Sequence, residues 1–206
     1  MKIQKIILAS QSPRRRQLLQ WAEIKFDVVV ANTDESYPEH LRPEEIATHI
    51  AYNKAIAVKN NLTGSITNAE DCTILAADTI VVLKNVIIGK PYNREHAIQI
   101  LSELSGNTHS VITGVCILKR GKKIIFADET KVEFYELTRQ QIEYYVDNYK
   151  PYDKAGAYAI QEWIGVTGIR SIAGDFYNVM GLPVSRVVKE LANLTASENL
   201  TGFQNL

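Results

Sequence analysis

The first twenty residues change from a continuous apolar run to an amphipathic pattern. Residues 6–9 are all apolar, which predicts a short buried strand. Residues 10–12 form a polar turn, and Ser12 followed by Pro13 is typical of a helix start with serine as the N-cap. A strand that turns directly into a helix leaves free backbone N–H groups at the positive end of the helix dipole, where anions bind.

Three arginines, residues 14–16, follow this turn at once. They surround the predicted helix start with positive charge, so the pattern predicts a phosphate-binding corner. The alternative is a strand, turn and helix without a ligand, because this arrangement is common and arginines in a first helical turn oppose the helix dipole. The local pattern leaves both interpretations open.

A second strand and a long helix come next. Residues 25–31 predict a strand centred on the three valines 28–30, and the polar loop 32–36 contains Asp34, which we interpret as a solvated residue. A helix is expected from Pro43 to about residue 60, since apolar residues recur there at helical spacing. Lys54 falls on that apolar stripe. We expect its side chain to reach along the stripe to solvent, and contact with an anion is the alternative.

Residues 72–83 form an apolar run that only the pair Asp78-Thr79 interrupts. The run predicts a strand buried on both faces. An ionised carboxylate in such a strand costs free energy unless it is hydrogen-bonded, paired or bound to a metal. We therefore interpret Asp78 as functional, with a structural aspartate at a bulge as the alternative. A hairpin turn at residues 84–85 and a return strand at 86–88 bring Lys90 back, so that Lys90 and Asp78 can approach each other.

The second half of the chain continues this mixture of strands and helices after a polar loop at residues 60–71. Helices are expected at residues 93–104 and 138–148, and long strands at 109–119 and 122–137. The small, charged and aromatic residues of 150–161 suit a close-fitting loop and short helix near a ligand. A further strand is expected at 166–173, then a final helix to about Leu194. Without repeats or linkers, we expect one domain at residues 1–194 and a loose polar tail at 195–206.

Composition narrows the classes of protein and of partner. The chain has 206 residues, enough for one large domain or two small lobes. Its 23 basic and 23 acidic residues give no net charge, whereas nucleic-acid binders usually show a basic excess. Nucleic acid is therefore not an expected partner, and any anionic ligand must be met by local charge.

The cysteines and the apolar runs indicate a compartment. Cys72 and Cys116 lie in apolar runs and are expected to be buried free thiols in a reducing environment. The N-terminal apolar run is too short for a signal peptide, and no run is long enough to span a membrane. We expect a soluble, cytoplasmic protein without a membrane partner.

Several common catalytic motifs are absent from the sequence. It contains no P-loop, no GxGxxG after a strand, no HExxH and no CxxC pair. Its four histidines are scattered, which argues against a histidine-based metal site. The absence of a Gly-x-Ser-x-Gly elbow argues against a serine hydrolase.

Four motifs occur in an order that resembles one family along nearly the whole chain, from Lys5 to about Leu194. They are Leu8-Ala9-Ser10-Gln11-Ser12-Pro13-Arg14-Arg15, Ala77-Asp78-Thr79 with Gly89-Lys90-Pro91, Asp153-Lys154-Ala155-Gly156-Ala157-Tyr158 with Ile160-Gln161, and Asn178-Val179-Met180-Gly181-Leu182-Pro183. Together they resemble the Maf family of nucleoside triphosphate pyrophosphatases, also called septum formation inhibitor proteins.

The resemblance implies a fold, a reaction and a substrate branch. The implied fold is α/β, with an elongated twisted mixed β-sheet flanked by helices, in two lobes with a central cleft, as in inosine triphosphatases. The implied reaction hydrolyses a nucleoside triphosphate to the monophosphate and pyrophosphate with a divalent cation. The motifs are similar to those of the branch acting on dTTP and UTP, and they imply Arg14, Thr79 and Gln161 as specificity positions. Ala159 and the bulky segment 162–164 depart from that branch and affect the shape of the base pocket.

The resemblance also implies roles for the charged residues. Asp78 would be the general base for water or a metal ligand, and Glu35 would hold the cation, with Mg²⁺ or Mn²⁺ favoured by oxygen ligands. The groups expected to bind the triphosphate are Ser10, Ser12, Arg15, Lys54 and Lys90.

Two residues of the sequence bear on recognition of the base. In an extended strand Thr79 points to the face opposite Asp78, so it acts only if the backbone bends or if it shapes the pocket indirectly. Gln161 can present its amide to a pyrimidine edge. Because an amide can flip, Gln161 alone would not separate uracil from cytosine.

Two other functions remain as alternatives. One is the same reaction on a modified purine triphosphate such as 7-methyl-GTP. The other is a nucleotide-binding regulator of cell division with little turnover. A nucleoside triphosphate is the expected partner in each case, and a homodimer is left open.

Overall fold

The computed structural model describes residues 3–63 and 72–202. The strands are β1 (Ile6–Leu8), β2 (Phe26–Val28), β3 (Thr73–Leu83), β4 (Val86–Ile88), β5 (Thr108–Lys119), β6 (Lys122–Phe134) and β7 (Ile169–Ala173). The helices are α1 (Pro13–Trp21), α2 (Pro43–Thr63), α3 (Arg94–Leu104), α4 (Arg139–Tyr149), the short 3₁₀ helix η2 (Ala155–Ala157), α5 (Trp163–Gly168), α6 (Phe176–Met180) and α7 (Val184–Gly202).

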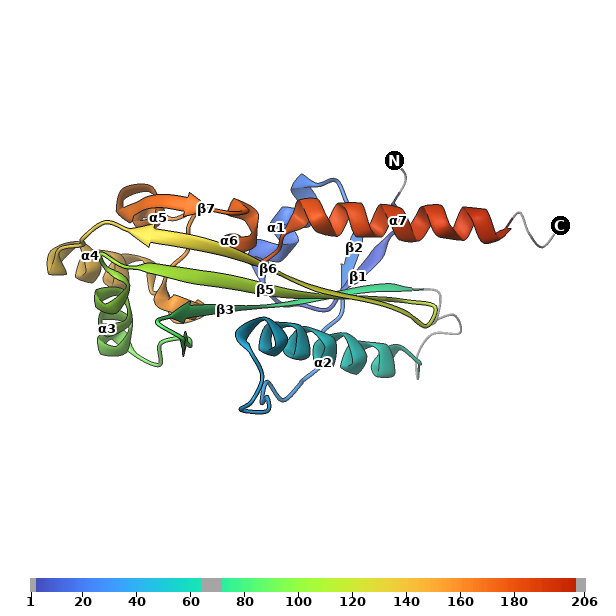
Figure 1. The fold of residues 1–206 in the computed structure, drawn as a ribbon, viewed down its shortest axis with the longest axis horizontal. Coiled ribbons are helices and arrows are strands. Elements are labelled where there is room, and N and C mark those ends of the chain that lie inside the picture. Colours follow the sequence, from blue (N-terminus) through green and yellow to red (C-terminus); the bar gives the residue numbers. More distant parts are fainter. Residues whose placement is uncertain (1–2, 64–71, 203–206) are drawn as a thin grey trace.

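All seven strands belong to one mixed sheet. The strand order is β2-β1-β3-β5-β6-β7, and β4 also pairs with β3. β1 runs parallel to β2 and β3, whereas every other pair is antiparallel. The three long strands β3, β5 and β6 run side by side along the elongated molecule (Figure 1). The predicted α/β fold with a mixed sheet flanked by helices is confirmed.

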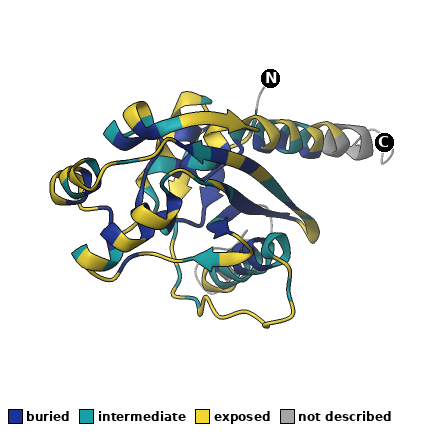
Figure 2. Ribbon diagram, turned by 60° about the vertical axis from the view of Figure 1, so that its left-hand side comes forward, coloured by how far each residue is buried: buried dark blue, intermediate teal, exposed yellow. Residues whose placement is uncertain are grey.

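Helices cover both faces of the sheet, and the two-residue period of a strand decides which side chains meet them. Ile74, Ala76 and Ile80 of β3 face α2, while Leu75, Ala77 and Val81 belong to the larger core on the other face. In Figure 1 α2 lies on one side of the long strands, and α1, α6 and α7 lie on the other. Between them, β3 and β5 are largely buried, whereas β6 is more exposed (Figure 2).

A glycine allows α2 to lie directly against the sheet. A Cβ atom at Gly114 of β5 would lie 2.2 Å from the backbone carbonyl carbon of Ala47 in α2, so no other residue fits there without moving the helix. Gly114 pairs in register with Asp78 of β3. The close approach therefore holds α2 over the part of the sheet that contains Asp78.

The predicted starts of α1, α3 and α4 agree with the structure to within one residue. Ser12 accepts a hydrogen bond from the Arg15 N–H at the start of α1, and Asn93 caps α3 in the same way. Thr138 forms a capping box with Gln141 at the start of α4. Both cysteines are free; Cys116 is buried as expected, but Cys72 is only half-buried.

Several predicted boundaries are wrong. β2 is a three-residue edge strand, and Val28 and Val30 are each 40% exposed because only β1 pairs with this part of the chain. β6 ends at Phe134, beside a register shift, and not at residue 137. The strand expected at 166–173 begins only at Ile169, because residues 163–168 form α5, where Gly165 packs against the Ile160 carbonyl.

The two predicted polar segments are also partly helical. α2 continues to Thr63, and the rest of the expected loop, residues 64–71, lies outside the described residues. α7 continues to Gly202, so residues 195–202 are helical and do not form a loose tail. The last four residues of that predicted tail also lie outside the described residues.

Candidate active site

One edge of β3 is left open at its middle. β3 pairs with β5 without interruption on one side. On the other side it pairs with β1 as far as Leu75 and with β4 only from Val81. In the described part of the chain, residues 76–80 therefore have no strand beside them at this edge. The gap gives a ligand access to both faces of β3.

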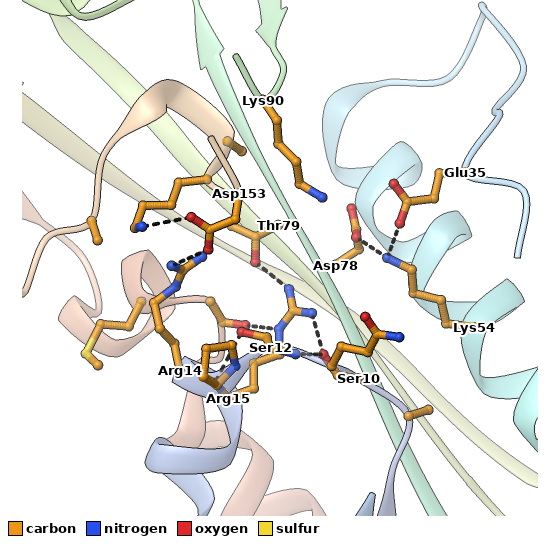
Figure 3. A pocket seen from close by; sticks show the side chains of 18 of the residues that line it. Ser10, Ser12, Arg14, Arg15, Glu35, Lys54, Asp78, Thr79, Lys90 and Asp153 are labelled. Carbon is orange, nitrogen blue, oxygen red and sulfur yellow. Dashed lines mark hydrogen bonds and ion pairs between the residues drawn. The ribbon is translucent and has the colours of Figure 1, made fainter. Parts of the chain in front are cut away.

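A pocket of about 500 Å³ opens at this gap. It is lined by the turn between β1 and α1, residues 30–35, α2, the middle of β3, and the segments around η2 and Gly181. All ten site residues expected from the sequence line it, and Figure 3 shows most of them: Ser10, Ser12, Arg14, Arg15, Glu35, Lys54, Asp78, Thr79, Lys90 and Gln161.

The pocket carries a local excess of positive charge although the whole chain is neutral. Five basic residues line it, and three acidic residues offset them only in part: Arg14, Arg15, Lys54, Lys90 and Lys154 against Glu35, Asp78 and Asp153. A multiply charged anion is the ligand that such a wall attracts.

Arg15 is a deeply buried cation of the pocket wall. Its side chain comes from the first turn of α1, and only 8% of the residue is exposed. Its guanidinium donates to Gly181 O (2.7 Å), Ser10 Oγ (3.1 Å) and Thr79 Oγ1 (3.0 Å). Burial lowers the pKa of Arg15, while the charge of Asp78 opposes that shift. Three of five guanidinium N–H groups are engaged, so two remain for a ligand.

The two serines of the predicted phosphate corner hold the backbone and Arg15 in place. Ser10 Oγ accepts from Arg15 and from the backbone N–H of Ser12 (3.2 Å), and Ser12 Oγ caps α1. Both hydroxyl groups line the pocket and retain a proton that can be donated to an anion. Arg16, by contrast, is exposed and contacts the carbonyl of Gln11 (3.5 Å).

Lys54 reaches the pocket from the opposite face of β3. Its ammonium group lies 2.6 Å from Asp78 Oδ1 and 2.7 Å from Glu35 Oε1 (Figure 3). The expectation that Lys54 reaches along its apolar stripe to solvent is wrong, because its side chain points at these two carboxylates and is only 19% exposed. The hydrogen bond from Lys54 lowers the pKa of Glu35, and burial opposes it. Lys54 thereby stabilises the ionised form of Glu35.

Asp78 and Thr79 point to opposite faces of β3, as the strand period requires, yet both line the pocket. The register of β3 and β5 is continuous through both residues, so no bulge is present. We expected Thr79 to act only if the backbone bends or if it shapes the pocket indirectly; the structure shows that Thr79 lines the pocket without a bend. The pocket lies at the open strand edge, and an edge gives access to both faces.

Three further predicted residues line the mouth of the pocket. Arg14 lies 3.5 Å from Asp153 in an exposed ion pair. Lys90 points into the pocket on the side of Asp78 (Figure 3), as expected, and its ammonium makes no ion pair among the described residues. Gln161 is exposed at the wall, so its amide is available to a ligand.

The carboxylates of Glu35 and Asp78 fit a hard divalent cation. Both lie within hydrogen-bonding distance of the same ammonium group, so their oxygen atoms converge on a small volume. Mg²⁺ commonly takes one or two carboxylates and completes its shell with water and substrate phosphates. Among the described residues, no group of three or more acidic, histidine or cysteine side chains is placed so that it could hold a metal ion. A cation here would therefore depend on the substrate for further ligands.

The sequence interpretation did not assign a role to a second set of charged residues, two of which line the pocket. Lys154 is buried, with its ammonium 2.8 Å from Asp153 and 3.5 Å from Glu162. Tyr145 donates a hydrogen bond to Glu162, and burial and this carboxylate raise the pKa of Tyr145. These contacts link the segment 153–162 to α4. The signal available in the sequence was the charged pair Asp153-Lys154 directly before the small residues 155–157.

The sequence was compared with protein families and with known proteins. Residues 5–194 match the family model described as Maf-like protein.

The chain belongs to the Maf-like family.

Its curated relatives include proteins named dTTP/UTP pyrophosphatase in Phocaeicola vulgatus, Parabacteroides distasonis and Cytophaga hutchinsonii, at 50%, 50% and 49% identity. The alignments cover 92%, 93% and 92% of this chain and 96%, 96% and 84% of those proteins. Among solved structures, the Staphylococcus aureus Ham1 protein aligns with a TM-score of 0.43 and 14% identity, over 65% of this chain and 73% of that chain. No described helix is long and apolar enough to cross a membrane.

Proposed function

We propose that the protein hydrolyses dTTP and UTP to the nucleoside monophosphate and pyrophosphate. The observation that carries the proposal is the open edge of β3, where a buried arginine and a lysine–carboxylate cluster line one pocket from opposite faces. A basic wall suits a triphosphate, and an aspartate in the same wall suits activation of water. Relatives at about half identity over more than 90% of this chain are named for this activity.

The two products require that the phosphoanhydride bridge between the α- and β-phosphates breaks. We assign the attack to the α-phosphorus: the oxygen atom of water bonds to it, and its bond to the oxygen bridging to the β-phosphate breaks. The proton of the water goes to Asp78, which lies in reach of the pocket and is paired with Lys54. The displaced pyrophosphate carries the developing negative charge away from the reacting centre.

The basic residues of the pocket stabilise the negative charge of the phosphate groups during the reaction. Arg15 has two N–H groups left and a fixed position, so it suits a phosphate whose place must not change during the reaction. Lys90 and the remaining N–H of Lys54 complete the cationic wall around Asp78. A divalent cation held by Glu35 and Asp78 would neutralise phosphate charge and polarise the phosphoryl oxygens.

Gln161 and Arg14 line the mouth of the pocket and leave the base end of the nucleotide within their reach. Gln161 can pair with a pyrimidine edge through both its carbonyl and its amino group.

We also infer that the protein works in the cytoplasm, since its two cysteines form no disulfide and one of them is buried.

The direct test is a panel of nucleoside triphosphates with both products measured. We expect the monophosphate and pyrophosphate from dTTP and UTP in equal amounts, with slower turnover of ATP, GTP, CTP and 7-methyl-GTP. Release of inorganic phosphate as the first product would contradict the proposed bond cleavage. Tight nucleotide binding without products would instead favour the regulatory alternative.

A further inference from the structure

A chain of hydrogen bonds leads from the pocket into the core behind Thr79. Thr79 Oγ1 lies 2.9 Å from Oγ1 of Thr113, its register partner on β5. Thr113 Oγ1 lies 3.1 Å from the backbone carbonyl of Asn178 in α6. Thr113 is fully buried and does not line the pocket. Its contacts with a ligand can therefore be only indirect.

The direction of the protons in this chain follows from its last member. A backbone carbonyl can only accept, so the single hydroxyl proton of Thr113 goes to Asn178 O. Thr113 can then only accept from Thr79, which must donate its own proton. Arg15 Nη2 donates to Thr79 Oγ1 (3.0 Å). The chain therefore runs from Arg15 through Thr79 and Thr113 to Asn178.

The acceptor at the end of the chain is held in place. Asn178 is fully buried, and its Nδ2 donates to Val111 O (3.0 Å) and to Thr130 Oγ1 (3.0 Å). Its backbone carbonyl belongs to α6 and cannot turn around as a side-chain amide can. Thr79 therefore has no proton left for a ligand, and its oxygen offers one remaining lone pair.

We propose that Thr113 is a positioning residue that keeps the Thr79 hydroxyl as an acceptor and so favours a base that presents an N–H group. Thymine and uracil carry a proton on N3, whereas N3 of cytosine is itself an acceptor. A Thr79 hydroxyl that can only accept would gain a hydrogen bond from N3–H of thymine or uracil. With cytosine, the lone pairs of the Thr79 oxygen and of N3 would repel each other. Gln161 cannot make this distinction, because its amide can flip. The proposal rests on the proposed function, with Thr79 beside the base.

The test compares UTP and CTP on three variants. Thr113→Val keeps the shape of the side chain but removes the acceptor for Thr79, so the Thr79 proton becomes free to point at cytosine N3. We expect the UTP-to-CTP ratio of kcat/KM to fall about tenfold, which corresponds to about one hydrogen bond. Thr113→Ser retains the hydroxyl group and should keep the ratio of the unmodified protein.

Thr130→Val is the matched control. Thr130 is fully buried, bonds to the same Asn178 and donates to Asp175 O (2.9 Å), but it lies outside the chain to Thr79. It should leave the ratio unchanged. An equal fall in both rates in Thr113→Val, or the same change of ratio in Thr130→Val, would overturn the proposal, because either result reports general damage to the core.

A second measurement needs no variant. The unmodified protein should hydrolyse 5-methyl-UTP about as fast as UTP but N3-methyl-UTP at least about tenfold more slowly, since only the second analogue lacks the N3 proton. Equal rates for UTP and N3-methyl-UTP would overturn the proposal even if Thr113→Val failed to fold. If no triphosphate at all is converted to monophosphate and pyrophosphate, the proposed function fails first, and the two failures are thereby distinguished.

Discussion

Arg15 and Lys54 reach the same pocket from opposite faces of β3, but their charges are held in different ways. Arg15 donates to three neutral oxygens and, among the described residues, forms no ion pair. Lys54 is bracketed by two carboxylates at 2.6 and 2.7 Å. Arg15 thus keeps an uncompensated positive charge in a fixed position, while the Lys54 cluster carries an excess of negative charge and contains the proposed base, Asp78.

The difference assigns separate tasks to the two faces. A buried cation with neutral partners gains most from an incoming anion, because its charge is desolvated and unpaired. A lysine between two carboxylates instead orients those carboxylates, and its hydrogen bond lowers the pKa of Glu35. We therefore expect the α1 face to hold phosphate and the α2 face to handle the proton and the cation.

The largest effect is expected at the α2 face. Asp78→Asn should lower kcat about 10²–10⁴-fold, since the amide cannot take a proton from water. The fold should persist, because Asn can still accept from Lys54. Thermal unfolding and pyrophosphate release measure the two properties. Asp34→Asn is the control, since Asp34 is exposed and bonds only to Ser36. A folded Asp78→Asn protein with near-normal turnover would remove Asp78 from the mechanism.

Replacement of Arg15 tests the α1 face. Arg15→Ala should raise KM strongly and cost roughly 2–5 kcal/mol of stability, because Ser10, Thr79 and Gly181 all lose a donor. Arg16→Ala should change stability by no more than about 0.5 kcal/mol, since Arg16 is exposed. KM for UTP measures the effect on substrate binding, and chemical denaturation measures the effect on stability. Equal losses at the two positions would indicate a diffuse basic patch in place of a fixed phosphate site.

Metal dependence separates the two carboxylates of the Lys54 cluster. Exhaustive chelation should abolish turnover, and Mg²⁺ or Mn²⁺ should restore it. Glu35→Gln should raise the metal concentration needed for half-maximal activity about tenfold or more, because one anionic ligand is lost. Glu39→Gln, at an exposed position in the same loop, should not. Full activity after chelation would exclude the proposed cation.

Gln161→Ala should have a smaller effect that depends on the base. We expect kcat/KM for dTTP and UTP to fall about tenfold and that for ATP and GTP to fall less, because a site that bonds to a base edge discriminates through those bonds. Gln11→Ala changes another exposed glutamine of the pocket wall and should affect all substrates alike. A uniform fall in Gln161→Ala would make Gln161 a general structural residue.

The smallest expected effect is a loss of stability at low pH. It involves a buried histidine that contacts the pocket wall. Burial lowers the pKa of His109 to about 4, and its Nε2 lies 2.8 Å from the hydroxyl of Tyr158 in the pocket wall. The ordinary pKa of histidine is about 6.5. Between that pH and about 4, His109 binds a proton more readily in the unfolded chain than in the folded protein, so acid favours unfolding. The contribution of neutral His109 is complete above that range and is lost as the pH falls through it.

Between pH 7 and pH 4, the free energy of unfolding of His109→Phe should therefore fall by roughly 2–3 kcal/mol less than that of the unmodified protein. His40→Gln, at an exposed position, should leave the shape of the curve unchanged. Denaturant unfolding at a series of pH values measures the difference. Superimposable curves for His109→Phe and the unmodified protein would show that His109 does not titrate in this range.

Local patterns determined much of the fold. The Ser12-Pro13 start of α1, the caps at Asn93 and Thr138, and the buried run of β3 were all predictable, because they depend on neighbours in the sequence. The boundaries of β2 and β7 were not. An edge strand extends only as far as its one partner allows, and that partner is far away in the sequence.

The sequence by itself determined which residues we propose for the chemistry: a lone carboxylate in an apolar strand, a lysine on an apolar helix face and arginines at a helix start. Only the tertiary structure decided how they meet. The interruption between β1 and β4 opens the edge of β3 to both faces, and Gly114 lets α2 approach so that Lys54 reaches Asp78. The proton direction at Thr79 likewise depends on a carbonyl 99 positions further along the chain, at Asn178. Sheet pairing and helix contact join segments distant in sequence, and local periodicity carries no information about such partners.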